Sequence, residues 1–209
     1  MSASTLPAVT GSSTVTAVIL DELETLHPEW APLPLPGTTE SVERPIVIPG
    51  TEPAQAARPV LVAVDDDDNA GVLLHHGSAM AEQLGVPLRA AYVWSDCRAP
   101  DCPHHRRCHR DLGEAGHLLT TLVDEHLATA PLIEREVMHA EDPVEALVAL
   151  SAEASVLLVG SSSDLPVPGG ALGGTTRRLL GRTACPVVVV PRQRSSATRG
   201  IWSGPANSR

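Results

Sequence analysis

The feature that most constrains this chain is a regular alternation between short, continuously apolar runs and longer segments with helical periodicity. Residues 59–65 and 185–191 are apolar at nearly every position, which is typical of strands buried on both faces. Segment 142–154 begins with Asp142 and Pro143, a common helix start. The predicted strands are 59–65, 87–94, 132–138, 155–160 and 185–191, and the predicted helices are 70–84, 111–130, 142–154 and 175–182.

Five strands separated by helices predict a three-layer, doubly wound α/β fold with a parallel sheet. In such sheets ligands bind beyond the carboxyl ends of the strands, at the switch point. Two strand ends carry unusual residues: an acidic run at 65–68 and a glycine-rich segment at 160–176. We therefore expect any small-molecule site to lie at these two strand ends.

Composition divides the chain into three parts. Residues 58–192 hold the alternating pattern, interrupted by a Cys/His-rich insertion at 95–110. Residues 1–57 are rich in Pro, Ser and Thr and predict a mostly mobile N-terminal arm. Residues 193–209 are polar and predict a disordered tail.

Two stretches of the arm differ from the rest of it. Residues 15–26 have a helical pattern. Residues 43–49, Glu-Arg-Pro-Ile-Val-Ile-Pro, resemble the last predicted strand at 185–191. This likeness has two interpretations: the remnant of an earlier repeat, or a short apolar segment that packs on the domain.

Composition also excludes several function classes. There is no Lys, so all 15 basic residues are Arg, and neither a P-loop lysine nor a Schiff-base lysine can be present. The net charge of −10 argues against a general nucleic-acid binder. No apolar run reaches about 18 residues, and no basic segment precedes an apolar one at the start. We therefore expect a cytoplasmic protein with neither nucleic acid nor membrane as partner.

The glycine-rich segment links a buried strand to a helix. Gly173 and Gly174 allow backbone N–H groups to approach an anion closely, and Thr175 and Thr176 add hydroxyls at the start of the helix. These features indicate a phosphate site, although a flexible connector would have the same composition.

The spacing of this segment resembles the motif of nucleotide-binding members of the universal stress protein family: Gly, two residues, Gly, nine residues, Gly, then Ser or Thr. Gly160 takes the first place and Gly173 the third. Ser163 stands where the family has its second Gly, and Gly174 where it has Ser or Thr, so the motif is partly degenerate. The first strand also ends in Asp65, like the family's strand.

This resemblance implies a five-stranded parallel sheet in the order 3-2-1-4-5, as in the adenine-nucleotide alpha-hydrolase-like fold. It also implies a homodimer formed through the fifth strand. The implied function is a stress-response regulatory module that binds ATP, with or without Mg²⁺. In that reading Asp65 contacts the adenosine end and the backbone of Val93 contacts adenine. The residues implied around the ribose and phosphates are Gly160, Ser163, Gly173, Gly174 and Thr175.

Two departures from the family pattern argue against nucleotide binding. A left-handed backbone at Ser163 would cost about 1–2 kcal/mol, which is about tenfold in affinity. A carboxylate of the 65–68 run lying about 4 Å from a phosphate would repel it by about 4 kcal/mol at an effective dielectric near 20. The same run can instead cap the following helix with Asp68 or Asn69. A nucleotide-free module therefore stays open as an alternative. The sequence contains no legible nucleophile–base pair, so any ATP hydrolysis would be slow.

The insertion after the second strand concentrates soft metal ligands. Zn²⁺ prefers four thiolate or imidazole ligands, but the Cys-x4-Cys-x5-Cys spacing is not that of a standard zinc finger. Neighbouring arginines would favour thiolates, which suits a redox sensor equally. The alternative function is therefore a dimeric module whose loop binds zinc or senses redox state, and a polar insertion without a metal is the third reading. The candidate ligands are Cys97, Cys102, His104, His105, Cys108 and His109.

Overall fold

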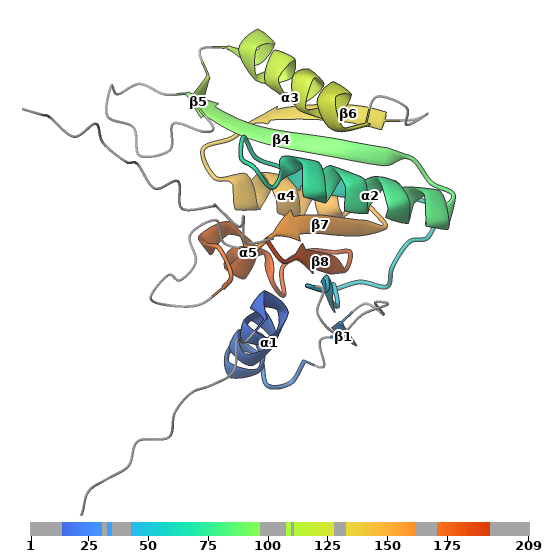
Figure 1. The fold of residues 1–209 in the computed structure, drawn as a ribbon, viewed down its shortest axis with the longest axis vertical. Helices are drawn as coiled ribbons and strands as arrows, with labels where there is room; N and C mark the ends of the chain where they lie inside the picture. Colours follow the sequence, from blue (N-terminus) through green and yellow to red (C-terminus); the bar gives the residue numbers. More distant parts are fainter. Residues whose placement is uncertain are drawn as a thin grey trace, which may run out of the picture.

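One sheet organises the part of the chain that the structure, a computed structural model, describes: residues 14–30, 33–34, 43–96, 108–109, 111–127, 133–161 and 171–192. Helices lie on both faces of this sheet (Figure 1). The helices are α1 (Val15–Leu26), α2 (Ala70–Leu84), α3 (Leu112–Leu127), α4 (Pro143–Ser151) and α5 (Gly174–Leu179). The strands are β1 (Leu33–Pro34), β2 (Ile46–Ile48), β3 (Val60–Val64), β4 (Leu88–Asp96), β5 (Cys108–His109), β6 (Ile133–His139), β7 (Val156–Gly160) and β8 (Val187–Val190).

Five of the strands pair in parallel, and their order across the sheet is β6-β4-β3-β7-β8. This is the predicted order 3-2-1-4-5, so the fold class and the strand order are confirmed. β3 lies in the middle, with Val60 opposite Leu88 of β4 on one side and opposite Val156 of β7 on the other. Because β3 and β7 are parallel neighbours, the loops that follow them leave the sheet at the same edge.

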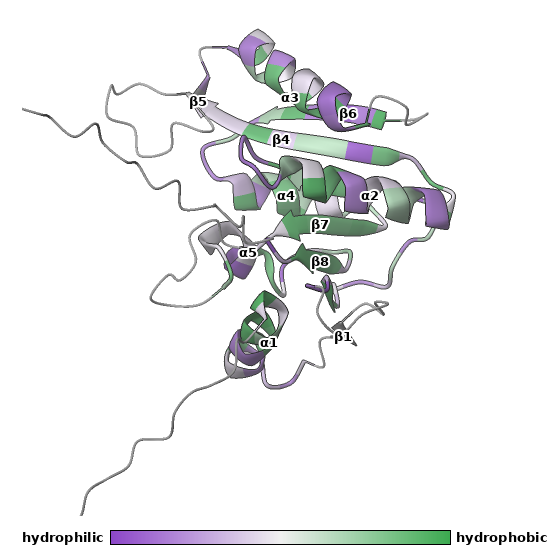
Figure 2. Ribbon diagram, viewed as in Figure 1, coloured by the Kyte–Doolittle hydropathy of each residue, from purple (hydrophilic) through white to green (hydrophobic). Residues whose placement is uncertain are grey.

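Alternate residues of the strands point into two separate cores. Leu61, Leu157 and Val187 belong to the core beneath α1, α4 and α5, whereas Val62 and Val188 belong to the core beneath α2 and α3. All five side chains are at most 1% exposed. β7 and β8 are hydrophobic along their length in Figure 2, as strands covered on both faces must be. None of the helices in the described ranges is both long and apolar enough to cross a bilayer.

The arm adds strands to the edge of this sheet. β2 pairs antiparallel with β8, and β1 pairs antiparallel with β2. The homodimer implied by the resemblance required an open β8 edge, and in the described structure β2 occupies that edge instead. Figure 1 shows β1 and α1 at the β8 side of the sheet, opposite β6.

The described segments of the arm pack into the domain, although composition predicted an arm that is mostly mobile. Val15, Ile19 and Leu23 lie four residues apart and form one apolar stripe along α1. These three side chains are at most 1% exposed, and so are those of Ile46 and Ile48 in β2. All five lie in the core beneath α1, α4 and α5. The helical pattern at 15–26 indicated this helix, but the composition of the arm did not indicate that the helix packs into the core.

Gly77 allows α2 to lie close to β3. A Cβ at this position would lie 2.3 Å from Val62 Cγ2 and 3.1 Å from Leu88 Cδ1. Gly77→Ala should therefore lower the free energy of unfolding by about 1–3 kcal/mol, despite the better helix propensity of Ala. The matched change Gly116→Ala in α3 meets no atom within 4 Å and should raise it by about 0.5–1 kcal/mol. Urea unfolding measures both, and a stabilised Gly77→Ala would contradict this packing.

Candidate functional site

A cavity of about 250 Å³ opens at the carboxyl ends of β3 and β7. β3, β4 and β7 contribute apolar wall residues, including Ala91 and Val159. The start of α4 contributes Pro143 and Leu147. Most of the remaining wall comes from the loop after β3 and the segment that begins α5. The cavity therefore lies at the sheet edge where the sequence predicts a small-molecule site.

Six of the seven predicted nucleotide-binding residues line this one cavity, and they come from four separate segments of the chain. Ser163 lies outside the described residues, so the structure says nothing of its backbone conformation. Thr175 is exposed at the rim, whereas Thr176 is buried and donates a hydrogen bond from Oγ1 to the Gly160 carbonyl (2.9 Å). The six residues are Asp65, Val93, Gly160, Gly173, Gly174 and Thr175.

Asn69 also lines the cavity, and the sequence analysis did not predict this. It begins α2 as its N-cap residue, as the alternative for the acidic run allowed, but its side chain makes no capping hydrogen bond. The amide packs against Gly160, where a Cβ would lie 2.7 Å from Asn69 Nδ2. Asn69 is 3% exposed, and its Oδ1 has no hydrogen-bond partner among the described residues. A buried, unpaired acceptor on a cavity wall favours a ligand that donates a hydrogen bond.

Arg192 neutralises part of the acidic run. Its guanidinium Nη1 lies 2.9 Å from Asp67 Oδ2, and Nη2 pairs with Asp68. Its backbone N–H donates to Ser161 Oγ (2.8 Å), which fixes Arg192 beside the end of β7. The side chains of Asp67 and Arg192 are each only 14% exposed. Two of the four carboxylates expected to repel a phosphate are therefore paired with a cation.

Sequence reasoning missed this role of Arg192, although one signal was available. Arg192 lies two residues after the end of β8, and β8 is the parallel neighbour of β7. Residues that follow parallel neighbouring strands lie at the same sheet edge. Its acidic partner Asp67 is 125 positions away, so no local pattern marks the pair.

Glu22 of the arm holds the end of the glycine-rich segment. Its Oε2 accepts hydrogen bonds from the backbone N–H groups of Ala171 (2.7 Å) and Leu172 (3.1 Å). Its Oε1 accepts one from Arg177 Nε (2.6 Å), and the Glu22 side chain is only 10% exposed. α1 therefore fixes the backbone immediately before Gly173.

Asp142 joins α4 to α5 beside the cavity. Its carboxylate accepts a hydrogen bond from the Val144 N–H (3.0 Å), as predicted for a helix cap, and pairs with the Arg178 guanidinium. The hydrogen bond from Arg178, followed by that from Val144, lowers the pKa of Asp142. This junction fixes Pro143 and Leu147, which form the apolar wall from α4.

The predicted metal ligands are only partly within the described residues. Cys97, Cys102, His104 and His105 lie outside them, and for Cys108 only the backbone is described. His109 is the one predicted ligand whose side chain is described, and its assignment as a zinc ligand stays a prediction. Its Nε2 hydrogen-bonds Tyr92 Oη (2.8 Å), and its Nδ1 faces Glu114 Oε2 at 3.9 Å.

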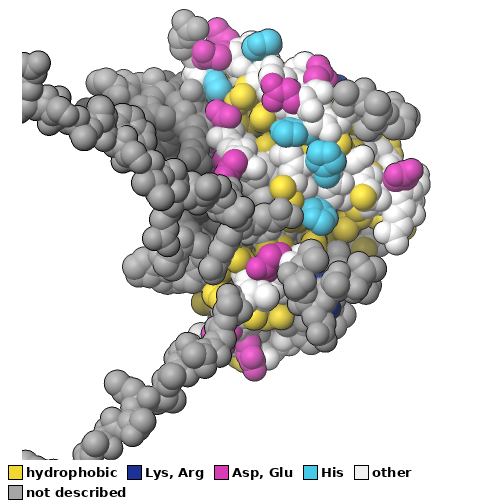
Figure 3. All heavy atoms as spheres, viewed as in Figure 1, with side chains coloured by type: hydrophobic (Ala, Val, Ile, Leu, Met, Phe, Trp, Pro, Cys, Tyr) yellow, Lys and Arg dark blue, Asp and Glu magenta, His cyan; other side chains and the backbone are white. Residues whose placement is uncertain are grey.

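Histidines also gather on the face that α2 and α3 cover (Figure 3). His75, His76 and His126 line a shallow groove there. His75 Nδ1 already contacts the Gly71 carbonyl (2.6 Å), and burial, followed by the proximity of His75, lowers the pKa of His76. Within the described ranges, no group of three or more His, Cys, Asp or Glu side chains is arranged to hold a metal ion.

Comparison with known proteins places this geometry in a family. Residues 56–191 match the model of the Universal stress protein family. A universal stress protein from Archaeoglobus fulgidus has the same fold at 22% identity, with a TM-score of 0.52 over 64% of this chain and 98% of that chain. A search of curated proteins found no match.

Two other solved structures give lower TM-scores. The universal stress protein from Archaeoglobus fulgidus in complex with dAMP is 21% identical and gives 0.47 over 65% of this chain and 99% of that chain. Universal stress protein UspA from Lactobacillus plantarum is 19% identical and gives 0.49 over the same shares of the two chains.

The Arg192 ion pairs should matter more for stability than a surface pair. Arg192→Gln leaves Asp67 without its cation in a site that is 14% exposed, and should lower the free energy of unfolding by about 1.5–3 kcal/mol. The matched change Arg182→Gln removes the exposed pair with Glu145 and should cost at most about 1 kcal/mol. Equal losses in urea unfolding would show that Arg192 has no special role at this edge.

Proposed function

Because this chain belongs to the universal stress protein family, we propose that it binds an adenine nucleotide, ATP, in the cavity between β3 and β7. One observation carries the proposal: the residues that the family motif assigns to the nucleotide line a single cavity at the carboxyl edge of the sheet. The protein then acts through its nucleotide-bound and nucleotide-free states.

The walls of the cavity suit the two ends of a nucleotide. Ala91, Val93 and Leu147 offer apolar surface for a planar base. Gly173 and Gly174 carry no side chains, so that phosphate oxygens can approach their backbone N–H groups. Between these ends, the Asn69 Oδ1 can accept a hydrogen bond from a ribose hydroxyl or from the adenine amino group.

The charge at the cavity edge is compatible with phosphates. Arg192 pairs with both Asp67 and Asp68, so its positive charge offsets one of their two negative charges without Mg²⁺. Asp65 lies on the cavity wall beside them, where its carboxylate can accept hydrogen bonds from ribose hydroxyls. Electrostatic repulsion therefore argues less strongly against nucleotide binding than the sequence of the acidic run suggested.

We propose a binding module without turnover of its own. The described residues that line the cavity include no His, Cys or Lys, so its Ser and Thr hydroxyls have no imidazole or amine among those residues to activate them. No observation on the described residues favours the zinc or redox alternative, since His109 already contacts Tyr92. The homodimer implied by the resemblance stays a prediction, because β2 occupies the β8 edge.

Calorimetric titration with ATP·Mg²⁺ tests the proposal. Asp65→Asn removes the carboxylate that lines the cavity and should raise the Kd for ATP about tenfold or more, as expected for a hydrogen bond to a charged group. The matched change Asp66→Asn alters an exposed neighbour outside the cavity and should leave the Kd within about twofold. Absence of heat with the wild-type chain, together with absence of nucleotide in the denatured protein's supernatant, would contradict nucleotide binding.

A further inference from the structure

The arm contacts one continuous stretch of the domain, residues 171–190, which runs from the cavity wall to the end of β8. β2, whose sequence resembles that of β8, pairs with this strand in the register that sets Val47 opposite Val188. Nearer the cavity, the Trp30 ring packs on the turn that follows α5, where a Cβ on Gly181 would lie 3.2 Å from Trp30 Cζ2. The arm therefore supports the stretch that begins at the cavity wall along much of its length.

The cavity-lining backbone of this stretch lies between two anchors. On one side, the Glu22 Oε2 accepts hydrogen bonds from the backbone N–H groups of residues 171–172. On the other side, Thr176 Oγ1 donates to the Gly160 carbonyl at the end of β7. Residues 173–175, which line the cavity, lie between these two contacts. The domain supplies one anchor, and the arm supplies the other.

The donors that Glu22 satisfies are buried. Ala171 is 0% exposed and Leu172 is 4% exposed, and the Glu22 side chain is 10% exposed. A buried backbone N–H that loses its acceptor is strongly unfavourable, so without this carboxylate the backbone would shift to reach water or another acceptor. Such a shift would change the direction of the N–H groups that follow it in the chain.

The charge of Glu22 is balanced at the same place. Its Oε1 accepts the hydrogen bond from Arg177 Nε at 2.6 Å. The Arg177 backbone N–H donates to the Gly173 carbonyl (2.9 Å) in the first turn of α5. One carboxylate oxygen therefore holds the segment before α5 while the other holds α5 itself. The cation also offsets a negative charge that would otherwise repel phosphate groups nearby.

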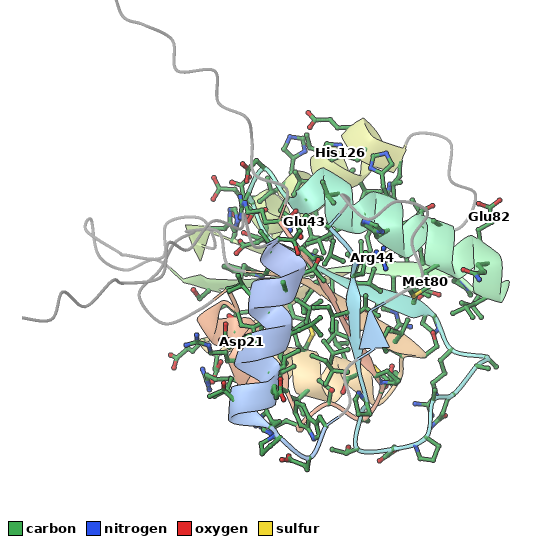
Figure 4. The ribbon with its side chains drawn as sticks, turned by 60° about the horizontal axis from the view of Figure 1, so that its bottom comes forward. Asp21, Glu43, Arg44, Met80, Glu82 and His126 are labelled. Atoms are coloured by element: carbon green, nitrogen blue, oxygen red, sulfur yellow. The ribbon has the colours of Figure 1, made fainter. Side chains whose placement is uncertain are left out.

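The position of Glu22 depends on β2, because α1 and β2 are held together as one unit. The Glu43 carboxylate, close before β2, accepts hydrogen bonds from the backbone N–H groups of Val15 and Thr16, each at 2.8 Å, and from Thr16 Oγ1 at 2.9 Å. Figure 4 shows Glu43 beside the start of α1, where a negative charge is favourable. The Arg44 N–H in turn donates to Thr16 Oγ1 (2.8 Å).

We propose that the arm is part of the ligand site and that Glu22 is a positioning residue, which fixes residues 173–175 for the phosphate groups of the nucleotide. This role rests on the proposed function. With α1 and β2 docked, the backbone N–H groups are ordered in advance, so that the ligand does not have to order them when it binds. A change that weakens docking of the arm therefore lowers the affinity for nucleotide although it lies outside the cavity.

Calorimetric titration of the full chain with ATP·Mg²⁺ tests this role. Glu22→Gln preserves the size of the side chain but removes its charge and one of its two acceptor oxygens, and should raise the Kd about fivefold or more. The matched change Glu24→Gln at an exposed position of α1 should leave the Kd within about twofold. Equal affinities of Glu22→Gln and the wild-type chain would overturn this role alone. A wild-type chain that binds no ATP would overturn the proposed function as well.

A core variant of the same helix separates positioning from stability. Ile19→Val removes one methylene group from the buried face of α1 and leaves the contacts of Glu22 in place. It should lower the free energy of unfolding in urea and leave the Kd for ATP unchanged. If the Kd values of Ile19→Val and Glu22→Gln rose in proportion to their losses of stability, Glu22 would have a merely structural role and the proposal would fail.

Amide hydrogen exchange on the ligand-free chain reports the anchor directly. Glu22→Gln should increase the exchange rate of residues 171–175 at least severalfold and leave that of β3 unchanged. Glu43→Ala lies away from the cavity and should have the same effect to a smaller extent, because it loosens α1 from β2. This second variant covers the case in which Glu22→Gln does not fold. Wild-type exchange rates at 171–175 in a folded Glu22→Gln chain, or in Glu43→Ala where Glu22→Gln does not fold, would overturn the proposal.

Discussion

The structure depends on the pairing of β3 with β7 in the middle of the parallel sheet. These strands are far apart in sequence, yet Val60, Leu61 and Val62 pair in register with Val156, Leu157 and Leu158. Their buried apolar side chains fix the pairing, since a shift by one residue would exchange the two core faces. The acidic loop and the glycine-rich segment therefore open at one place, and the cavity follows from the topology.

Charge then decides what this edge of the sheet can accept. Four consecutive aspartates would make this edge of the sheet repel anions, and the chain contains no Lys to offset their charge. Arg192 pairs with two of the four from the end of β8. Because Arg192 and Asp67 are each only 14% exposed, their pair is shielded from solvent more than a surface ion pair would be, whereas Asp68 is 65% exposed. A side chain at the end of the domain thus sets the electrostatics of a loop near its beginning.

Sequence reasoning reached the fold because local apolar runs report buried strands directly. It reached six cavity residues because the resemblance supplied their spacing. It missed Arg192 and Glu22, whose hydrogen-bond partners are up to 125 and 155 positions away and leave no local pattern. It indicated the helix at 15–26 but not its packing into the core, because the composition of the arm averages the three-residue stripe of α1 with Pro and Ser. The likeness of 43–49 to 185–191 was visible, but only the register of the two strands gave it a structural meaning.

Glu22 links two parts of the molecule that the sequence keeps separate. One carboxylate oxygen holds the backbone of Ala171 and Leu172 next to the cavity, while the helix that carries it is joined through Glu43 to the strand on β8. The docking of the arm on β8 and the position of the cavity wall therefore depend on the same side chain. By thermodynamic reciprocity, a ligand in the cavity that orders this backbone changes the free energy of arm docking. The docked arm changes the free energy of ligand binding by the same amount.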